Sequence, residues 1–379
     1  MTGNTPRPLR IGAIGVGLAM EKLHWPALER MADRFQITAF ADTSRETAEH
    51  FTTYNGASME AYHADYHDLL QRDDVDAVVI LLPIPLLYEA ARASLEAGKH
   101  ALCEKPTGSN EEQGHAFLQL EAQFPQQKLL IAENFFYRDD LRLARSLLDE
   151  GAIGRTNVMT WRQAHQAVPR PGSFSSTPWR QQPQYRGGVH LDGGVHMIAQ
   201  IRLLCGDVQR LHAFTQHANS TFGGPSDLLL NMTFVNRSVG SYVSVHSEVP
   251  VPPDDGNMRL YGSEGVMLVG SRDGTRTVSI HRPDRTTEEH RIEHSDGGYY
   301  NEWLNFHEAI MQDAPIIGTV TQSFHNMLIV LRALDSAEGS GVVEMEDVPG
   351  GIAEQSIPLW KPHGATGLFD GLPCNVTKA

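Results

Sequence analysis

Cysteine is scarce in this chain, which contains only Cys103, Cys205 and Cys374 among its 379 residues. A low and odd count argues against a disulfide framework and favours a reducing compartment, so we expect a cytoplasmic protein. The three cysteines lack the CxxC spacing of a structural metal site, and the 18 histidines include no HExxH pattern. We therefore predict that no metal cofactor is bound.

Positive charge is also in deficit, because 31 Lys and Arg face 46 Asp and Glu and the formal net charge is −15. Nucleic acids and anionic membrane surfaces require a basic face, so we expect neither as a partner. No apolar run approaches the length that spans a bilayer, and residues 1–7 lack the apolar segment of a signal peptide. A small molecule is the partner class that remains.

A glycine turn follows the first short apolar run. Residues 9–14 are predicted to form a buried strand, a glycine turn comes directly after them, and a helical pattern begins at Leu18. Strand, glycine turn and helix form the first unit of a dinucleotide-binding fold, whose glycines let the backbone approach a pyrophosphate. Gly15, Gly17 and Leu18 are therefore predicted cofactor contacts. Met20 replaces the third glycine of the motif, which predicts a slightly displaced helix.

An acidic residue ends the second predicted strand, residues 37–41. Asp42 lies 25 residues after Gly17, close to the spacing of an acid that binds the adenine-ribose hydroxyls, and this favours NAD. Arg45 follows three residues later and could accept the 2′-phosphate of NADP instead. The alternative role for Asp42 is the N-cap of the following helix. We predict NAD(H) or NADP(H) as cofactor, with NAD favoured.

Strand and helix patterns alternate as far as residue 132. Strands are expected at residues 75–82, 100–103 and 129–132, and helices at residues 89–97 and 111–124. This alternation predicts a doubly wound parallel sheet, an α/β Rossmann domain over residues 1–132. Ligands of such sheets bind at the carboxyl ends of the strands, where Leu82, Pro83 and Glu104-Lys105-Pro106 lie. We predict cofactor contacts from these five residues.

The pattern changes after residue 132 to strand-like runs with turn signals. Strands are expected at residues 157–164, 228–235, 239–246, 258–261, 266–269 and 277–281, and helices at residues 141–150, 300–312 and 322–337. Consecutive strands, with a hairpin signal at Asp273-Gly274, predict an α+β domain with a large, mostly antiparallel sheet over residues 133–349. Residues 350–379 are expected to be an irregular tail that could wrap a neighbour.

A glycine-rich stretch in this domain, residues 185–196, contains one acid and two histidines. If a helix begins near Asp192, then Asp192 and His196 lie four residues apart on one face. A carboxylate beside an imidazole can hold the ring and raise its basicity, as proton transfer requires. The alternative is a helix entry with an Asp N-cap and a buried histidine. His190 lies just before Asp192 and is a possible substrate contact.

Taken together, these motifs resemble the glucose–fructose oxidoreductase/inositol dehydrogenase (Gfo/Idh/MocA) family. The resemblance covers about residues 8–347 and is carried by Gly15-Val16-Gly17, His24-Trp25-Pro26-Ala27-Leu28, Asp76-Ala77-Val78, Ala97-Gly98-Lys99-His100, Glu104-Lys105-Pro106, Gly151-Ala152-Ile153-Gly154, Trp179-Arg180 and residues 185–196. It implies a nicotinamide cofactor held by residues 1–132. It also implies an open-faced sheet that carries the substrate and the interface of a homo-oligomer, a dimer or tetramer.

The family's catalytic set falls on Lys105, Asp192 and His196, and its Lys–Pro bond is commonly cis. The chemistry of carbinol oxidation gives these residues hypothetical roles. His196 takes the hydroxyl proton, Asp192 orients and charges the ring, and Lys105 stabilises the developing oxyanion and contacts the substrate. Lys105 could instead be the acid/base itself, since a desolvated lysine loses its proton more readily.

Other side chains are candidates for substrate contacts, and the substrate itself stays open. Arg180 and Tyr185 are predicted to contact polar substrate groups or else to pack in their loop, and His165 is a weaker candidate. Three features depart from the family pattern: Met20 replaces the third glycine, Leu86-Leu87-Tyr88 replaces a polar neighbourhood, and Ala199 replaces a second acid. The substrate class therefore cannot be copied from inositol dehydrogenases.

The predicted function is an NAD(P)-dependent oxidoreductase. It would transfer hydride between the nicotinamide and a hydroxyl or carbonyl carbon of a sugar, a polyol or a related cyclic compound. One alternative is an NAD-dependent, redox-neutral glycoside hydrolase. The other is a non-catalytic nucleotide or sugar sensor on the same fold.

Overall fold

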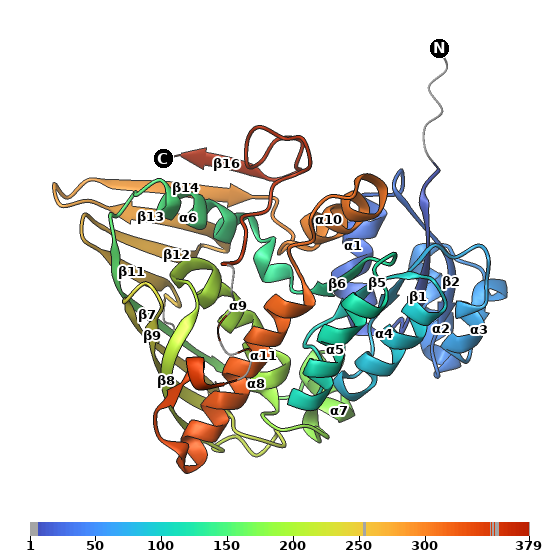
Figure 1. The fold of residues 1–379 in the computed structure, drawn as a ribbon, viewed down its shortest axis with the longest axis horizontal. Coiled ribbons are helices and arrows are strands. Elements are labelled where there is room, and N and C mark those ends of the chain that lie inside the picture. Colours follow the sequence, from blue (N-terminus) through green and yellow to red (C-terminus); the bar gives the residue numbers. More distant parts are fainter. Residues whose placement is uncertain (1–6, 253–254, 349, 351, 353–355, 379) are drawn as a thin grey trace. The chain divides into compact units, whose positions relative to one another are not determined.

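Figure 1 draws the computed structural model, which describes residues 7–252, 255–348, 350, 352 and 356–378. The chain divides into two compact units. One contains Met1–Ala132 with Tyr299–Val320, and the other contains Glu133–Gly298 with Thr321–Ala379. We expected residues 299–320 in the second domain, but they pack on the first unit. The backbone N–H of Ile131, for example, donates to the Gly318 carbonyl at 2.8 Å.

The first unit is built on a six-stranded sheet of order β3-β2-β1-β4-β5-β6, in which every pairing is parallel. The strands are β1 (Leu9–Ile14), β2 (Phe35–Ala41), β3 (Tyr62–His63), β4 (Ala77–Ile80), β5 (His100–Glu104) and β6 (Leu129–Ala132). This topology confirms the predicted doubly wound Rossmann sheet. The central strands are buried almost throughout, as a sheet covered on both faces requires.

Helices cover both faces of this sheet. They are η1 (Met20–His24), α1 (Trp25–Glu29), α2 (Arg45–Asn55), η2 (Met59–Ala61), α3 (Tyr66–Leu70), η3 (Ile84–Leu86), α4 (Leu87–Glu96), α5 (Glu111–Gln123) and α10 (Tyr299–Gln312). Helices α3, α4 and α5 bury their apolar sides in one core cluster on one face, Phe117 among them. On the other face α2 packs Phe51 against Phe40, with ring centroids 4.9 Å apart, and α10 packs Trp303 against Phe35 at 5.0 Å.

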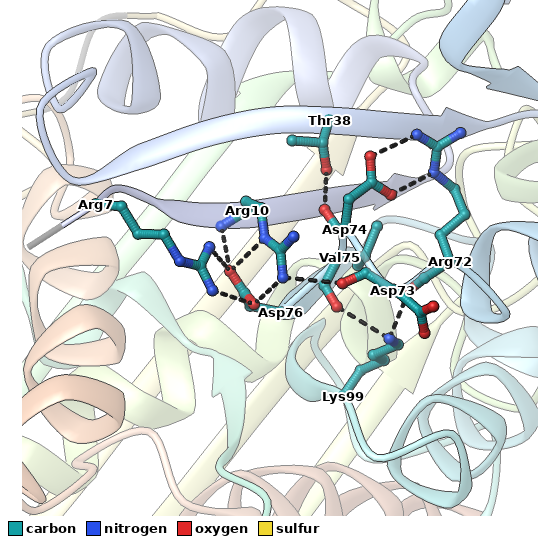
Figure 2. Close-up of polar contacts among 9 residues, drawn as sticks. All are labelled: Arg7, Arg10, Thr38, Arg72, Asp73, Asp74, Val75, Asp76 and Lys99. Atoms are coloured by element: carbon teal, nitrogen blue, oxygen red, sulfur yellow. Dashed lines mark hydrogen bonds and ion pairs between the residues drawn. The ribbon is translucent and has the colours of Figure 1, made fainter.

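Charged residues connect the amino ends of the strands in this sheet by hydrogen bonds and ion pairs (Figure 2). Asp76, just before β4, accepts hydrogen bonds from the Arg10 backbone N–H at 2.9 Å, from Arg10 Nη2 at 2.7 Å and from Arg7 Nη1 at 2.9 Å. Lys99 Nζ donates to the carbonyls of Arg72 and Val75 at 2.8 and 3.0 Å. Burial disfavours the ionised Asp76, but the arginine hydrogen bonds outweigh it and hold the pKa of that carboxyl well below its usual range. This end of the sheet is therefore structural, opposite to the edge where the glycine turn lies.

The second unit contains a ten-stranded sheet of order β15-β8-β9-β10-β7-β11-β12-β13-β14-β16. Its strands are β7 (Thr156–Gln166), β8 (Val208–Gln216), β9 (Asp227–Phe234), β10 (Val239–Ser247), β11 (Met258–Gly262), β12 (Val266–Arg272), β13 (Thr275–His281), β14 (Thr287–Glu293), β15 (Val343–Glu344) and β16 (Asn375–Lys378). Only β7 and β10 pair in parallel, which confirms the predicted mostly antiparallel sheet. Along β9 the odd-even alternation buries Leu228, Leu230 and Met232 and exposes Leu229, so one face of the sheet stays open.

Helices of this unit pack on the covered face of the sheet. The longer ones are α6 (Asp139–Asp149), α9 (Gly194–Cys205) and α11 (Val320–Asp335), and the short ones are η4 (Asn134–Phe136), η5 (Phe174–Ser176), α7 (Pro178–Gln181), α8 (Val189–Asp192), η6 (Ser336–Ser340) and η7 (Met345–Asp347). Helix α6 contacts β12, β13 and α9. The glycine-rich stretch that opens α9 is thereby fixed to the core of the unit.

The C-terminal segment packs on its own unit through a buried arginine. Arg142 of α6 donates to the Trp360 carbonyl at 3.0 Å and to the Leu368 carbonyl, and its guanidinium lies 4.7 Å from the centre of the Trp360 ring. Asp139 pairs with the same guanidinium at 3.0 Å. Residues Asn375–Lys378 then form β16 on β14. The described part of the predicted irregular tail thus belongs to the fold of this chain and ends in a strand.

Candidate active-site residues in each unit

The glycine turn in the first unit lies between the carboxyl ends of two strands. The Gly15 N–H donates to the Ala41 carbonyl of β2 at 2.8 Å. Gly15 has φ +83°, and a Cβ there would lie 2.6 Å from the Leu81 carbonyl oxygen after β4, so only glycine fits. A Cβ at Gly17 would meet nothing within 4 Å, so this side of the turn is open. Open backbone at the carboxyl edge of a Rossmann sheet fits the pyrophosphate of a dinucleotide.

The remaining predicted cofactor contacts of this unit also lie near strand ends. Leu18 begins the helix that follows the turn, and Leu82 and Pro83 follow β4; all three are partly exposed. Pro106 after β5 is buried. Met20 is fully buried and starts a wide π-helical turn, η1, before α1. The helix is therefore irregular at the position where the third glycine of the motif is replaced.

Asp42 joins the glycine turn to the end of β2. Its Oδ2 accepts from the Val16 N–H at 3.1 Å, and its Oδ1 accepts from the Ser44 N–H at 2.8 Å. The N-cap of α2 is Ser44, so the N-cap alternative for Asp42 is wrong. Arg45 pairs with Glu49 at 2.9 Å in an exposed i,i+4 ion pair, which is weak because water screens it. The carboxylate is thus held beside the glycine turn, and the arginine lies on the outer surface of α2.

A chain of hydrogen bonds in the first unit ends at the Glu-Lys-Pro motif. Trp303 Nε1 donates to His24 Nδ1 at 3.2 Å, and His24 Nε2 lies 3.1 Å from Glu104 Oε1. An indole N–H only donates, so His24 Nδ1 accepts and Nε2 carries the proton that Glu104 receives. The backbone N–H of Lys105 donates to Glu104 Oε2 at 3.2 Å, and the Lys105–Pro106 bond is cis. In the sequence, His24 is only part of a motif that the family shares, and Trp303 lies within the helix expected at residues 300–312.

His196 in the second unit has a carboxylate partner that the sequence analysis did not name. Glu133 Oε1 lies 2.6 Å from His196 Nδ1. Glu133 is completely buried, whereas the His196 side chain is 17% exposed. The Phe135 ring stacks on the His196 imidazole with centroids 4.8 Å apart. The Arg138 guanidinium lies over the Phe135 ring, 4.4 Å from its centre. A carboxylate on Nδ1 leaves Nε2 as the ring nitrogen available to a ligand.

Asp192 pairs with an arginine. Arg180 Nε donates to Asp192 Oδ2 at 2.7 Å, and the guanidinium lies 4.0 Å from the centre of the Trp179 ring. The helix expected to carry Asp192 and His196 on one face is interrupted: α8 ends at Asp192 and α9 begins at Gly194. The orienting carboxylate of His196 is therefore Glu133, and Asp192 is connected to Arg180. Whether Asp192 also acts on the ring stays a prediction.

A cavity of about 360 Å³ lies within the second unit. The residues that line it include three predicted substrate contacts, Arg180, Tyr185 and Asp192, together with the weaker candidate His165. Burial and the nearby Asp192 raise the pKa of the Tyr185 hydroxyl far above its usual value, so this group stays protonated and can donate. The cavity thus collects residues that the sequence separates by more than twenty positions.

His190 is buried and does not line this cavity. Its side chain is inside the unit, the residue is 2% exposed, and its ring lies 5.6 Å from that of His246. Burial, with a smaller effect of His246, lowers the pKa of His190 to about 3. The histidines that line the cavity are His165 and His246, so a direct substrate contact from His190 stays a prediction. Ala199 is fully buried in α9.

The described residues offer neither a metal site nor a membrane-spanning helix. In the part of the chain that the structure describes, no three His, Cys, Asp or Glu side chains are grouped as metal ligands. None of the described helices is long and apolar enough to cross a bilayer.

Comparison with known proteins assigns the chain. The model of the oxidoreductase family with an NAD-binding Rossmann fold, GFO_IDH_MocA, matches residues 9–130, and that of the GFO/IDH/MocA C-terminal domain matches residues 141–268. The dTDP-3,4-didehydro-2,6-dideoxy-alpha-D-glucose 3-reductase of Streptomyces violaceoruber is 31% identical over 296 residues, which cover 75% of this chain and 80% of that protein. The chain belongs to the Gfo/Idh/MocA family of oxidoreductases.

Other members of the Gfo/Idh/MocA family are similar to this chain. The levoglucosan dehydrogenase of Pseudarthrobacter phenanthrenivorans is 28% identical over 216 residues, covering 54% of this chain and 53% of that enzyme. The crystal structure of an oxidoreductase from Thermotoga maritima superposes with a TM-score of 0.81 and 27% identity, covering 90% of this chain and all of the other. This Gfo/Idh/MocA member is thus a nicotinamide-dependent dehydrogenase or reductase that acts on CH–OH groups.

Proposed function

We propose that the enzyme transfers hydride between NAD and a hydroxyl or carbonyl carbon of a sugar, a polyol or a related cyclic compound. The observation that carries this proposal is the contact of 2.6 Å between His196 Nδ1 and the buried Glu133 carboxylate. It provides an oriented base for the hydroxyl proton, which oxidation of a carbinol requires. The names of the similar sugar reductase and levoglucosan dehydrogenase support the substrate class.

The proposed catalytic set is Lys105, Asp192 and His196, with Glu133 added as the residue that orients the imidazole. His196 Nε2 accepts the proton of the substrate hydroxyl, and the Lys105 ammonium stabilises developing negative charge on the substrate. Asp192, paired with Arg180 at 2.7 Å, binds a substrate hydroxyl in the cavity. When bound, the nicotinamide supplies the hydride acceptor or donor.

The preference for NAD over NADP is proposed from Asp42. Both carboxylate oxygens of Asp42 are fixed by backbone N–H groups at the end of β2. A carboxylate there accepts hydrogen bonds from the two ribose hydroxyls and repels a 2′-phosphate. Arg45, the residue that could favour NADP, pairs with Glu49 on the exposed side of α2.

A substrate screen tests the function. Sugars and polyols are incubated with NAD and with NADP, and product formation is measured together with the nicotinamide absorbance. We expect product with a matching change in absorbance, and a higher kcat/KM with NAD. Product without net absorbance change would instead favour the redox-neutral glycoside hydrolase. Saturable sugar binding without any product would favour the sensor.

We further propose a homo-oligomer that forms through the open face of the ten-stranded sheet. Exposed apolar side chains lie on neighbouring strands of this face: Phe214 pairs with Leu229 across β8 and β9, and Val158 lies between Val239 and Tyr261 on β10 and β11. Contiguous exposed apolar residues mark interaction surfaces, and a second copy of the chain presents the same surface. Light scattering after size exclusion tests this: we expect Phe214→Glu to lower the mass to that of one chain. A wild-type monomer would contradict it.

A cytoplasmic location is proposed from the thiols. The structure contains no disulfide among the described residues, and Cys103 and Cys205 are buried as free thiols. Such thiols persist in a reducing compartment. Fluorescence microscopy of a tagged chain tests the location, and a signal confined to another compartment would contradict it.

A further inference from the structure

Three histidines lie in a row in the second unit. The ring centroids of His165 and His246 are 4.6 Å apart, and those of His246 and His190 are 5.6 Å apart. His165 and His246 are register partners on the parallel strands β7 and β10. Both line the cavity of about 360 Å³, whereas His190 does not. His246 is therefore the central member of the row and part of the cavity wall.

The row is uncharged near neutral pH. Burial, together with the neighbouring His165, lowers the pKa of His246 to about 4, and burial lowers that of His165 as well. The effect is stronger for His190, whose pKa is lowered to about 3. Protonating one ring would place a charge beside another imidazole in a poorly solvated region. The cavity wall thus presents neutral imidazoles.

A backbone contact fixes the tautomer of His246. Its Nδ1 lies 2.8 Å from the carbonyl oxygen of Ser226, which can only accept, so Nδ1 carries the proton. In a neutral ring Nε2 is then an acceptor without a hydrogen. Among the described residues Nε2 has no hydrogen-bond partner, and it is not one of the polar atoms sealed from solvent. A ligand in the cavity therefore meets an acceptor.

The rest of the cavity wall fits a small ring compound. Phe174, Phe222 and Val189 contribute apolar surface, and the charge of Arg180 is balanced by Asp192. Carbon-bound hydrogens of a sugar ring pack on such aromatic surface, while its hydroxyls need polar partners. The volume is near the lower end of the range of about 300–1,000 Å³ for small-molecule sites. The cavity suits a single ring.

From this geometry we infer that His246 is a specificity-determining residue that accepts a hydrogen bond from one hydroxyl of an uncharged, monosaccharide-sized polyol. The inference rests on the proposed function and names the substrate class that the cavity selects. A carboxylate or phosphate oxygen has no hydrogen to donate, so the lone pair of Nε2 repels it. The neutral ring of His165 beside it provides no compensating charge. A carboxylate or phosphate group is therefore excluded from contact with His246, and the lining residue left to attract such a group is Arg170.

Two substitutions of His246 distinguish the loss of the hydrogen-bond acceptor from a disturbance of the fold. In His246→Asn the amide nitrogen stands near Nδ1 and keeps the bond to Ser226, but the acceptor in the cavity is lost. In His246→Gln the longer side chain can still bring an amide oxygen to the position of Nε2. We expect His246→Asn to lower kcat/KM for the best neutral polyol by about 10- to 100-fold, mainly through KM, and His246→Gln to lose less. His281→Asn, an exposed histidine on β13, is the matched control and should behave as wild type.

The substrate panel contains neutral sugars and polyols, their mono-deoxy analogues, the uronic acids and the sugar phosphates. If the inference holds, one deoxy analogue has the same kcat/KM with wild type and His246→Asn, because it lacks the hydroxyl that donates a hydrogen bond to His246. An equal loss for every analogue, or none, would overturn it. So would a wild-type preference for uronic acids or sugar phosphates, although the proposed function would then stand. Wild type that turns over no member of the panel would overturn the proposed function, and the inference with it.

Discussion

In each unit one histidine–carboxylate pair has a fully buried partner, but the group that stays accessible differs. In the first unit His24 is fully buried and Glu104, at 3.1 Å, is 14% exposed. In the second unit Glu133 is fully buried and His196, at 2.6 Å, is 17% exposed. The accessible group is thus the carboxylate in the first unit and the imidazole in the second. We infer that the first pair serves binding and fold stability and the second serves proton transfer.

The largest expected effect comes from removing the accessible imidazole. His196→Ala should lower kcat by about 10²- to 10⁴-fold, because the substrate hydroxyl loses its base. Steady-state kinetics on the best substrate, with cofactor affinity measured separately, tests this. The control is His281→Ala at an exposed position of β13. Wild-type turnover in His196→Ala would remove the proton-transfer role from the second pair.

Lys105→Ala is the parallel test on the first unit. We expect a loss of kcat of similar order, because negative charge on the reacting oxygen is no longer stabilised. Unchanged turnover, with cofactor affinity also unchanged, would show that Lys105 lies outside the catalytic set. A larger loss than in His196→Ala would favour the lysine as the principal acid/base.

The next effect tests the buried carboxylate behind His196. A glutamine at position 133 can donate its amide hydrogen to Nδ1, which would move the ring proton to Nε2 and block proton acceptance. We expect Glu133→Gln to lower kcat by about 10- to 1,000-fold with little change in KM, and Glu133→Asp, which keeps the charge, to lose less. Nitrogen NMR of the His196 ring reports the tautomer directly. Glu293→Gln, at an exposed site on β14, is the control, and an unchanged tautomer in Glu133→Gln would contradict the role.

A smaller effect on catalysis, and a larger one on stability, is expected for the buried histidine of the first pair. His24→Phe leaves the Trp303 indole N–H without its acceptor, which costs about 1–3 kcal/mol in unfolding free energy. Urea unfolding measures this cost. In a Trp303→Phe background the cost should shrink, since the donor is already absent. A loss of kcat as large as that of His196→Ala, with stability unchanged, would show that the two pairs do not differ in role.

The sequence indicated most of the architecture and only part of these pairs. Alternation of apolar runs located five of the six strands in the first sheet and six of the ten in the second, because the periods of strands and helices are local. Strands β8 and β14 were missed since charged or polar residues interrupt their apolar pattern, and β3, β15 and β16 were missed since they are only two to four residues long. The helix at residues 300–312 was predicted, but its apolar residues do not show which sheet it covers. This is why residues 299–320 were assigned to the wrong part of the chain.

The partners of the two histidines could not be read from spacing. Glu133 and His196 are 63 residues apart, and His24 and Glu104 are 80 apart. Asp192 was the acid nearest to His196 in the chain, but the helix between them breaks at Gly193 and Arg180 takes its carboxylate. Spacing identifies neighbours within one helix, whereas these contacts depend on how distant elements pack.

The smallest expected effect concerns the other end of the first unit's sheet. Asp76 has a lowered pKa, so its ionised form stabilises the fold at neutral pH, and this contribution is lost as pH falls from the usual aspartate range through the lowered value. We expect Asp76→Asn to lower the unfolding free energy by about 1–2 kcal/mol near neutral pH, with a smaller difference in acid. Urea unfolding at several pH values measures this. It should leave the KM for the cofactor unchanged, and a changed KM would mean that the two ends of the sheet are not independent.

The ten-stranded sheet ends in two short strands, and this has a consequence for solubility during folding. Its edges are β15, Val343–Glu344, and β16, Asn375–Lys378. Long, unpaired edge strands recruit other chains into aggregates, whereas short ones that carry lysine resist such recruitment. Lys378 of β16 also pairs with Glu288 of β14 at 2.7 Å. This ion pair helps to hold the four-residue strand β16 on the seven-residue strand β14. Deleting the last five residues would remove β16 and leave β14 as an unpaired edge strand. We expect aggregation to begin at this edge while the His24–Glu104 and His196–Glu133 pairs are still intact.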